Sequence, residues 1–587
     1  MRDVIVIGTG AGGPATAKEL AARGLDVLML EAGPKFDKPP EQWSRLEDDA
    51  NNQVNGYLRI GPGDRDRGGY ARENVQYGYV QTVMAVGGTT THYFGNAPRA
   101  YPGVFAGYSG KDKSNYDTKH LFPFDYCTLI PYYEWAEATL PVQAAAMGTK
   151  EEIWFRGARG LGLPLQKTKD VMGRAHRPQP NAILQPRGNA GKTNDPDKLL
   201  YPEARGCTFC GHCYQGCFEP RGAPRNLAAK RSTDNSYVPM ALTADLWQKG
   251  GKAATLIADA YVTKIHVDGD GSARAVDWRD TYTGETRTEE AKVIVLAGGC
   301  VENPRLWLNS GLPNPNDWVG RGATDHQNDI IIGLFPFYTG HSKGPGAAVR
   351  AEFPGYGGME AFAAGPALQA AIATFSDAGV HGAYDNGTPF SSAGADTFGR
   401  LVGNDLRKFM EHGVDRMLNV FILADDDVEP QNRVNVSQQL PPDENGPVPR
   451  YENHQRNRSA RTKRNREFMA RKAVQLLRKA GATHVHRPAM PPIYVQTTMR
   501  MGHRKDDSVV DANQESWFVP RLFITDVSSI PNSLGGPNPT LTVQALAAKS
   551  AEAIFTKYFD GEPWVHREAP VVSTDRRISK GLAARGY

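Results

Sequence analysis

The sequence predicts an α/β protein organised around a parallel sheet that is covered by helices. Three observations predict this class. Residues 4–7 form a continuous apolar run, which is typical of a strand buried on both faces. A glycine-rich turn and a helical segment separate this run from a second strand, which ends at Glu31. Residues 292–311 and 520–555 repeat the order of strand, glycine-rich loop and helix.

The turn after the first strand has the spacing G-x-G-x-x-G, formed by Gly8, Gly10 and Gly13. The first glycine allows a tight turn, the second lets the backbone approach a pyrophosphate, and the third lets helix and strand pack closely. The following helix offers free N–H groups and partial positive charge to phosphates. Glu31 lies about 20 residues beyond the glycines, where a carboxylate binds a ribose hydroxyl. The segment predicts a Rossmann-like dinucleotide site and does not distinguish FAD from NAD.

The two later segments extend this domain. In residues 292–311 an apolar strand ends in glycines, and Asn303 with Pro304 marks the start of a helix. Residues 520–555 contain a strand, a loop rich in Gly, Pro and Asn, and a long amphipathic helix. Because both ends of the chain serve one nucleotide site, we expect the cofactor to extend through the whole domain.

Composition and charge exclude several classes of function. The 587 residues carry 68 Lys and Arg against 64 Asp and Glu, so a net charge of +4 gives no case for nucleic acid or an acidic membrane surface. The basic segment at residues 456–482 is interpreted as a solvated helix face. No apolar run of about 18 residues predicts a membrane span, and no export signal precedes the first strand. We therefore expect the chain to reach the periplasm or a membrane only with a partner that carries the signal, with a cytoplasmic location as the alternative.

Several segments, in family order, resemble the glucose–methanol–choline (GMC) family of flavoprotein oxidoreductases. They are the N-terminal glycine motif, AVGGTTTHYFGNAPR (85–99), LAGGCVENPRLWLNSG (296–311), VGRGATDH (319–326), MRMG with SVVD (499–511) and LFITDVSSIPNSLGGPNPTLTVQALA (522–547). The resemblance implies an FAD cofactor and oxidation of an alcohol carbon by hydride transfer to flavin N5. It also implies a mixed-sheet substrate-binding domain beside the Rossmann-like FAD-binding domain.

The expected domains follow from the same resemblance. The FAD-binding domain comprises residues 1–100, 236–330 and 496–560. A flavin-covering insertion with a cysteine cluster spans 101–235, and the substrate-binding domain spans 331–495. Residues 561–587 form a tail without helical periodicity.

By the same resemblance, Asp526 faces the ribityl chain, and Gly87 with Gly88 faces the isoalloxazine. His92 lies in TTTHYFG, where the related pyranose oxidases have a histidine attached covalently to the flavin. The FAD is therefore bound either through His92 or non-covalently, with His92 as a polar contact near the ring. The expected cofactor-binding residues are Gly8, Gly10, Gly13, Glu31, Gly87, Gly88, His92, Asp526, Asn538, Pro539 and Thr540.

Alcohol oxidation requires that the hydroxyl proton leave as the hydride departs, and a histidine suits this step because its pKa lies near working pH. The family pairs such a histidine with a second His or Asn, here Asn538 in GGPNPTLT. This chain reads YVQTTMRMG at 494–502, so Tyr494 stands where the histidine is expected and Thr497 replaces a glycine. A phenol with a pKa near ~10 is a poor base at neutral pH.

Three interpretations of Tyr494 remain open. Tyr494 hydrogen-bonds the substrate hydroxyl while another group takes the proton, or a histidine from elsewhere is the base, or the site has lost alcohol oxidation. The candidate histidines are His503, which we take as the first choice, and His484, His486 and His326.

Four cysteines, Cys207, Cys210, Cys213 and Cys217, follow the spacing C-x2-C-x2-C-x3-C of bacterial ferredoxins, with Phe218 in place of the usual proline. The spacing predicts an iron–sulfur cluster, either [4Fe–4S] or [3Fe–4S]. Zinc is an alternative, although zinc ribbons separate their two C-x2-C pairs, and an empty cysteine-rich loop is another. Disulfides between such close cysteines are geometrically awkward.

The cysteines also resemble those in the large subunits of gluconate dehydrogenase and of FAD-dependent glucose and fructose dehydrogenases. In the glucose-dehydrogenase branch these cysteines hold an iron–sulfur cluster. This resemblance implies a sugar or polyol dehydrogenase that passes electrons to a cytochrome c or a quinone and works with a small partner subunit that carries an export signal. The alternatives are an oxygen-using oxidase similar to pyranose oxidase, with structural cysteines, and an FAD-bearing subunit with an altered site.

Overall fold

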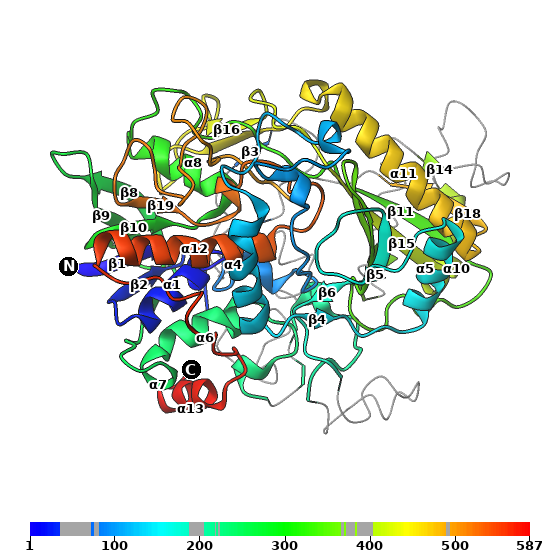
Figure 1. The fold of residues 1–587 in the computed structure, drawn as a ribbon, viewed down its shortest axis with the longest axis horizontal. Coiled ribbons are helices and arrows are strands. Elements are labelled where there is room, and N and C mark those ends of the chain that lie inside the picture. Colours follow the sequence, from blue (N-terminus) through cyan, green and yellow to red (C-terminus); the bar gives the residue numbers. More distant parts are fainter. Residues whose placement is uncertain are drawn as a thin grey trace.

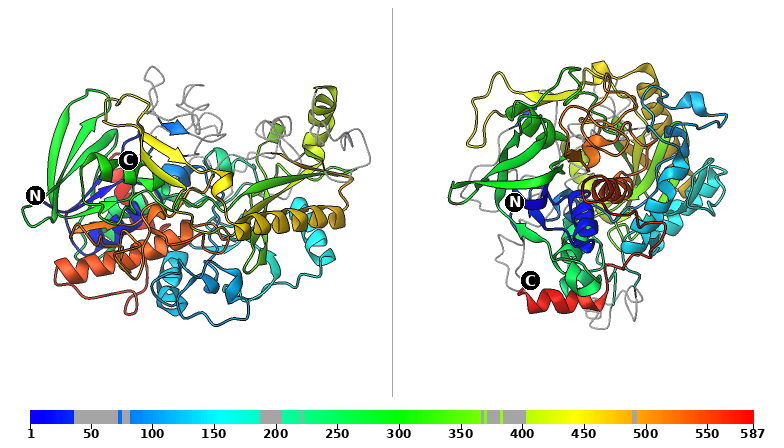
Figure 2. Two further views of the ribbon diagram at one scale, coloured as in Figure 1. Left: turned by 90° about the horizontal axis from the view of Figure 1, so that it is seen from above. Right: turned by 60° about the vertical axis from the view of Figure 1, so that its left-hand side comes forward.

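The computed structural model describes residues 1–35, 72–74, 82–186, 205–217, 219–220, 223–365, 369–370, 382–383, 403–488 and 493–587. The molecule is elongated, and its two large sheets lie at opposite ends (Figures 1 and 2). The N-terminus lies at the end that holds the first sheet (Figure 1).

The first sheet has the strand order β7-β2-β1-β10-β9-β8, and β19 also pairs with β10. Its strands are β1 (Arg2–Ile7), β2 (Val27–Leu30), β7 (Thr255–Ile257), β8 (Ala260–Val267), β9 (Ala273–Asp280), β10 (Thr286–Leu296) and β19 (Leu522–Ile524). The pairs among β7, β2, β1, β10 and β19 are parallel, whereas β9 and β8 extend the sheet with antiparallel pairs. The strands come from all three expected parts of the FAD-binding domain.

Alternate residues of β1 face opposite layers, as its continuous apolar run predicts. Val4 and Val6 pack with α1 (Gly13–Ala22), α6 (Tyr237–Leu242) and the end of α12 (Thr540–Tyr558). Ile5 and Ile7 pack with α8 (Gly299–Asn309) and the antiparallel extension. Each such buried side chain contributes about 1.5–3 kcal/mol relative to an exposed one. This burial on both faces fixes β1 at the centre of the layer.

The second sheet has the order β14-β18-β11-β15-β13-β12-β5. Its strands are β5 (Ala175–Pro178), β11 (Asp329–Leu334), β12 (Val349–Phe353), β13 (Gly357–Phe362), β14 (Gly382–Ala383), β15 (Met417–Ala424) and β18 (His484–Arg487). All of these pairs are antiparallel. The predicted Rossmann-like domain with a second sheet domain is confirmed, but parallel and antiparallel strands are mixed in the first sheet rather than the second. The edge strand β5 comes from the expected insertion.

The two faces of the second sheet have different partners. One face packs against α5 (Thr149–Gly160) and the 21-residue α11 (Ala460–Ala480), seen together beside this sheet in Figure 1. The other face carries Phe362 and Phe421 and packs with Phe94, Cys207 and Cys213. The second face therefore looks towards the first sheet and the cysteine segment.

Shorter elements complete the fold. They are β3 (Glu73–Asn74), α4 (Tyr126–Thr139), β4 (Gln143–Ala144), β6 (Pro180–Asn181), α7 (Ala244–Trp247), α10 (Gly403–Gly413), β16 (Arg433–Val436), β17 (Pro449–Glu452) and α13 (Arg576–Ala584). The tail differs from the prediction, since it ends in α13, which is capped by Asp575 and buries Ile578 and Leu582 one turn apart against the first domain. Within the described ranges no helix is long and apolar enough to cross a membrane.

Candidate active site

A large cavity opens at the carboxyl ends of the parallel strands. Its walls include Ile7 and Gly8 after β1, Glu31 after β2, Gly298 after β10 and Asp526 after β19. The empty volume, with solvent at the mouth included, is about 1910 Å³. Ligands of open α/β sheets bind in this crevice, at the point where the strand order reverses. The cavity therefore lies where a dinucleotide is expected.

The glycine turn is shaped to leave room in this cavity. A Cβ on Gly8, which has φ +98°, would lie 2.4 Å from the Ala297 carbonyl oxygen, and a Cβ on Gly13 would lie 2.2 Å from the Gly8 oxygen. A Cβ on Gly10 would meet no protein atom within 4 Å, so this backbone faces open space. Gly12, which the spacing argument does not single out, also requires glycine because a Cβ would lie 1.7 Å from the Thr525 oxygen. These contacts match the roles expected for a turn beside a pyrophosphate.

Two buried acids mark the cavity wall. Glu31 accepts hydrogen bonds from the Thr9 N–H at 2.8 Å and the Thr9 hydroxyl at 2.6 Å, and burial raises its pKa to about 7. Asp526 accepts from the Gly299 N–H at 2.6 Å and from Asn303 Nδ2 at 2.8 Å, and burial raises its pKa. Removal from water dominates both shifts. Each carboxyl lies at the cavity where the ribose and ribityl hydroxyls are expected.

The segment around Gly88 forms another wall. Gly87 and Gly88 have φ of 101° and 50°, and the turn Gly88–Thr91 leads into His92. The His92 side chain lines the cavity, and its Nδ1 lies 2.9 Å from the Tyr214 carbonyl oxygen. Burial lowers the pKa of His92 to about 4, so the ring is neutral at pH 7. A neutral imidazole at this wall suits either a polar contact or a covalent bond to the cofactor.

Tyr494 and Asn538 meet at the end of the cavity beneath the second sheet. Asn538 Nδ2 donates to the Tyr494 hydroxyl oxygen at 3.0 Å, and both side chains line the cavity. Pro539 and Thr540, at the start of α12, line the same region. Burial and the nearby Glu360 carboxylate raise the pKa of Tyr494 further above that of a free phenol. At neutral pH Tyr494 is therefore a hydrogen-bond donor rather than a base.

Aromatic rings form the roof over this pair. Phe94 lies 5.0 Å from both Tyr214 and Phe362, measured between ring centroids, and Phe421 lies 5.6 Å from Phe362 and 6.0 Å from Tyr494. All five rings line the cavity. Phe362 and Phe421 come from β13 and β15, so the second sheet supplies a flat, apolar surface above the reacting groups.

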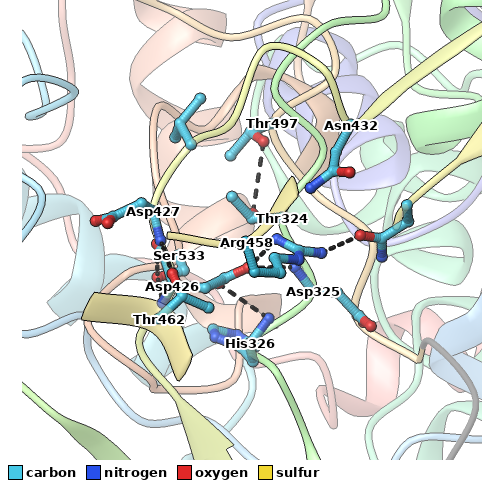
Figure 3. Close-up of polar contacts among 12 residues, drawn as sticks. Thr324, Asp325, His326, Asp426, Asp427, Asn432, Arg458, Thr462, Thr497 and Ser533 are labelled. Atoms are coloured by element: carbon cyan, nitrogen blue, oxygen red, sulfur yellow. Dashed lines mark hydrogen bonds and ion pairs between the residues drawn. The ribbon is translucent and has the colours of Figure 1, made fainter. Parts of the chain in front are cut away.

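A buried polar network around Asp325, His326 and Asp426, shown in Figure 3, is hydrogen-bonded to the backbone of Tyr494. Asp325 Oδ1 accepts from the backbone N–H of Tyr494 at 2.9 Å. The backbone N–H groups of Asp325 and His326 in turn donate to Asp426, which pairs with Arg458 at 2.9 Å. Burial raises the pKa of Asp325 to about 7 and that of Asp426 to about 6. The end of β15 thereby positions the segment that carries Tyr494.

The structure separates the four candidate histidines. The His326 ring packs edge-on against Tyr494, with centroids 5.4 Å apart, and within the described part of the chain neither ring nitrogen has a hydrogen-bond partner. Burial lowers the pKa of His326 to about 3. His503, our first choice for the base, instead lies exposed in the loop after Met501 and does not line the cavity. His484 and His486 lie on β18 and are likewise absent from the cavity wall.

Three residues beside the pair were not predicted as site residues: Glu360 and Arg350, which lie outside the quoted motifs, and Asn96, which lies within residues 85–99. Arg350 Nη1 donates to Asn538 Oδ1 at 3.1 Å, and Asn538 Nδ2 lies 3.3 Å from Glu360 Oε1. Asn96 donates to both oxygens of Glu360 at 3.0 Å. In VRAEF (349–353) and GGMEAF (357–362), alternate residues point to opposite faces of the sheet, and this alternation places the charged residues of β12 and β13 on one face. It could have indicated from the sequence that Arg350 and Glu360 lie together.

The four cysteines lie between this site and the surface. Cys207 and Cys213 are buried, Cys217 is half-buried and Cys210 is exposed. Burial and repulsion between neighbouring thiols raise the pKa of Cys207. Backbone N–H groups offset this effect at the sulfurs: Phe209 N lies 3.5 Å from Cys207 Sγ, and other amides hydrogen-bond Cys210 and Cys213. Among the described residues, however, no three His, Cys, Asp or Glu side chains converge closely enough to hold a metal ion.

Lys230 joins the cysteine segment to the cavity wall. Its buried Nζ donates to the Thr91 and Cys213 carbonyl oxygens, both at 2.6 Å. His92 also contacts the cysteine segment through the Tyr214 carbonyl. The wall expected to face the flavin is thus in direct hydrogen-bonded contact with the cysteine segment.

Comparison with known proteins agrees with this architecture. Two family models described as GMC oxidoreductase match, one for the N-terminal domain at residues 186–328 and one for the C-terminal domain at 428–547. The 2-methyl-1,2-propanediol dehydrogenase of Mycolicibacterium austroafricanum is 26% identical, with 95% of this chain and 96% of the relative covered. The fructose dehydrogenase large subunit of Gluconobacter japonicus is also 26% identical, with 95% and 98% covered.

Among solved structures, a pyridoxine 4-oxidase from Mesorbium loti has the same fold, with a TM-score of 0.58 at 15% identity. The match covers 96% of this chain and 100% of that structure. The sheet order, the cavity at the strand ends and both family models agree, and we conclude that the chain belongs to the GMC oxidoreductase family.

Proposed function

We propose that this protein oxidises a sugar or polyol hydroxyl with bound FAD and passes the electrons through an iron–sulfur cluster to a cytochrome or quinone acceptor. Membership of the family implies FAD, and the open space at Gly10 and the buried acids at the cavity wall fit that cofactor. The observation that carries the proposal is the Tyr494–Asn538 pair, which lies where the dinucleotide cavity meets the second sheet. When bound, FAD supplies the acceptor for the hydride that leaves the carbinol carbon.

The chain's own residues supply orientation and hydrogen bonds. Asn538 Nδ2 donates to the Tyr494 hydroxyl oxygen, so the Tyr494 O–H hydrogen points in another direction and can be donated to a substrate oxygen. Such a donor holds the alcohol oxygen and stabilises the negative charge that develops as its proton leaves. His326, neutral at pH 7, is the candidate histidine that contacts Tyr494. We therefore favour the interpretation in which Tyr494 binds the hydroxyl and another group takes the proton.

The roof of the cavity bears on the substrate. Phe94, Phe362 and Phe421 present carbon faces above the Tyr494–Asn538 pair. An aromatic face packs well against the C–H face of a sugar ring and excludes water from the reacting atoms. This roof supports a substrate with one hydrophobic face and a hydroxyl directed at Tyr494.

The cysteine spacing supports the iron–sulfur cluster. Cys207, Cys210, Cys213 and Cys217 would be its ligands, and the amides at the sulfurs are the kind of donors that stabilise cluster thiolates. A cluster here would divide the electron pair of reduced flavin for a cytochrome c, beside the exposed Cys210. The relative named as a large subunit supports a small partner subunit, which would carry the export signal to the periplasm or membrane.

A second candidate is an oxygen-using sugar oxidase in which the cysteines are structural. Two observations favour it: no three metal-ligating side chains converge in the described residues, and a relative from Streptomyces fradiae is named paromamine 6'-oxidase. An oxidase needs only oxygen at the flavin, so it does not need an iron–sulfur cluster to carry electrons to another protein. Analysis of iron and sulfide in the purified protein separates the two candidates.

The test combines cofactor analysis with substrate screening. We expect a flavin absorbance near ~450 nm, stoichiometric iron and sulfide, and anaerobic bleaching of the flavin by at least one sugar or polyol. Cys213→Ser should lose iron, whereas the control Cys127→Ser should retain it, since Cys127 is exposed on α4 outside the cluster. An iron-free but active protein would overturn electron transfer through an iron–sulfur cluster and leave alcohol oxidation standing. No bleaching by any alcohol would overturn alcohol oxidation.

A further inference from the structure

A completely buried carboxylate lies directly behind the proposed reaction site. Glu360 is on β13, on the face that also carries Phe362, and its exposure is 0%. Three amide side chains donate to it: Asn96, Gln179 at 2.9 Å and Asn538. Neither of its own oxygens can donate a hydrogen bond while the group is ionised.

We propose that Glu360 is a positioning residue that orients the side-chain amides of Asn96 and Asn538. In this way it sets the hydrogen-bonding polarity of the reaction site, that is, which groups donate hydrogen bonds and which accept them. This inference deepens the proposed function and rests on it. Glu360 acts through its neighbours and does not itself contact the substrate.

Asn538 shows how the orientation arises. The amide edge that faces Glu360 and Tyr494 must be the NH2 group, because Glu360 only accepts. The other edge, Oδ1, accepts from Arg350 Nη1 at 3.1 Å. The network thus assigns both ends of this amide, which would otherwise be interchangeable in shape. It follows that the Tyr494 oxygen accepts and its O–H hydrogen is left to donate.

Asn96 is oriented in the same way, with its NH2 group towards Glu360. Its Nδ2 donates to both Glu360 oxygens at 3.0 Å. Asn96 is one of the residues that line the cavity, and its buried Oδ1 has no hydrogen-bond partner within the described ranges. A buried acceptor without a partner is costly unless a ligand satisfies it. The site therefore offers the Tyr494 O–H as a donor, and the orientation of both asparagine amides depends on the charge of Glu360.

The surroundings of Glu360 make this polarity sensitive to pH. The charged and titratable groups nearby are Arg350, whose Nη1 lies 3.9 Å from Glu360 Oε2, Glu352 on β12, Tyr494, and His326 behind it. Burial outweighs Arg350 and raises the pKa of Glu360 to about 7. As the pH falls through this value the group gains a proton, and three amide donors face a carboxyl that now also donates. The oriented site is present above about pH 7 and is lost below it.

The experiment compares three variants of the holoenzyme. Glu360→Gln keeps the shape but places an NH2 group among amide donors, and Glu360→Asp keeps the charge. The matched control is Glu352→Gln, since Glu352 is equally buried on the neighbouring strand but pairs with Arg177, Tyr101 and Arg350 rather than with the two asparagines. The rate of anaerobic flavin reduction is measured against pH, with the alcohol that bleaches the wild-type flavin fastest.

We expect wild type to lose rate as the pH falls through about 7. Above pH 7, Glu360→Gln should reduce the flavin about 100-fold more slowly, because misoriented groups slow a reaction by this order. Its KM should change little. Its rate should no longer depend on pH in this range. Glu360→Asp should restore part of the rate and the pH dependence. Glu352→Gln should lower thermal stability but keep the pH dependence.

Two results would overturn the proposal: a Glu360→Gln variant that keeps the fall in rate below pH 7, or a Glu352→Gln variant that loses it equally. If no alcohol reduces the flavin, the proposed function fails. The positioning role of Glu360 is then tested by a measurement that needs no substrate. The flavin absorbance of the oxidised holoenzyme is then titrated with acid. A spectral change with a midpoint near pH 7 in wild type that is absent in Glu360→Gln supports the positioning role, and the same titration in both proteins refutes it.

Discussion

The buried ion pair network that joins α11 to the second sheet predicts a large loss of stability when one carboxylate is neutralised. Asp329, at the start of β11, binds Arg466 of α11 through Nε and Nη2, both at 2.8 Å, and binds Arg487 of β18 through Nε at 2.9 Å. Asp329 and Arg487 are 0% and 1% exposed. Asp329→Asn preserves the shape and leaves two guanidinium groups without their main counter-charge.

The expected cost is about 3–5 kcal/mol in the free energy of unfolding, because breaking a buried pair leaves an uncompensated charge. The matched control is Glu290→Gln, which removes a pair with Arg274 whose partners are about half exposed, and its cost should not exceed about 1 kcal/mol. Replacing Arg487 by Met in the Asp329→Asn background should recover part of the loss, since the orphaned charge disappears.

The assay is equilibrium unfolding in urea, followed by tryptophan fluorescence, because Trp154 on α5 is buried in the same core as α11. Burial alone raises the pKa of Asp329, but Arg466 and Arg487 hold it below its usual value. The stabilisation is therefore present above about pH 4 and disappears as the pH falls through the lower pKa of the folded protein. If Asp329→Asn costs no more than Glu290→Gln, or keeps the acid-dependent part of the stability, the reasoning is refuted.

Three further predictions concern the cavity. Gly10→Ala should fold normally but retain less FAD, because its Cβ would meet no protein atom within 4 Å. Gly13→Ala should also lower the temperature of unfolding, because its Cβ would overlap the Gly8 oxygen. Measurements of flavin content and thermal unfolding distinguish the two variants. Tyr494→Phe should lower the rate of flavin reduction about 100-fold with FAD content unchanged, the usual effect of losing one donor to developing negative charge; an unchanged rate would show that Tyr494 does not bind the substrate oxygen. Phe421→Ala should raise KM for the substrate with little change in FAD binding, and equilibrium dialysis with steady-state kinetics separates these effects.

The local sequence was sufficient to predict the first strand, the glycine turn, the helix and the second strand. The apolar run of residues 4–7, the glycine turn and Glu31 lie within one continuous segment, where spacing and periodicity act over a few residues. Their positions in β1, the turn and the end of β2 agree with that prediction. The pairing of Tyr494 with Asn538 was likewise expected from two family motifs, and the structure brings the two side chains within 3.0 Å.

Only the tertiary structure decided which further residues surround that pair. Nothing in the local sequence distinguishes His503 from His326, yet one lies exposed and the other packs against Tyr494 because Asp426, at the end of β15, binds the backbone of the His326 loop. Glu360 reaches Asn538 through the register of β13 with β12, which pairs Arg350 with Glu360. A sequence determines which face of a strand a side chain occupies, but its neighbours across strands and domains depend on register and packing, which arise only when the chain folds.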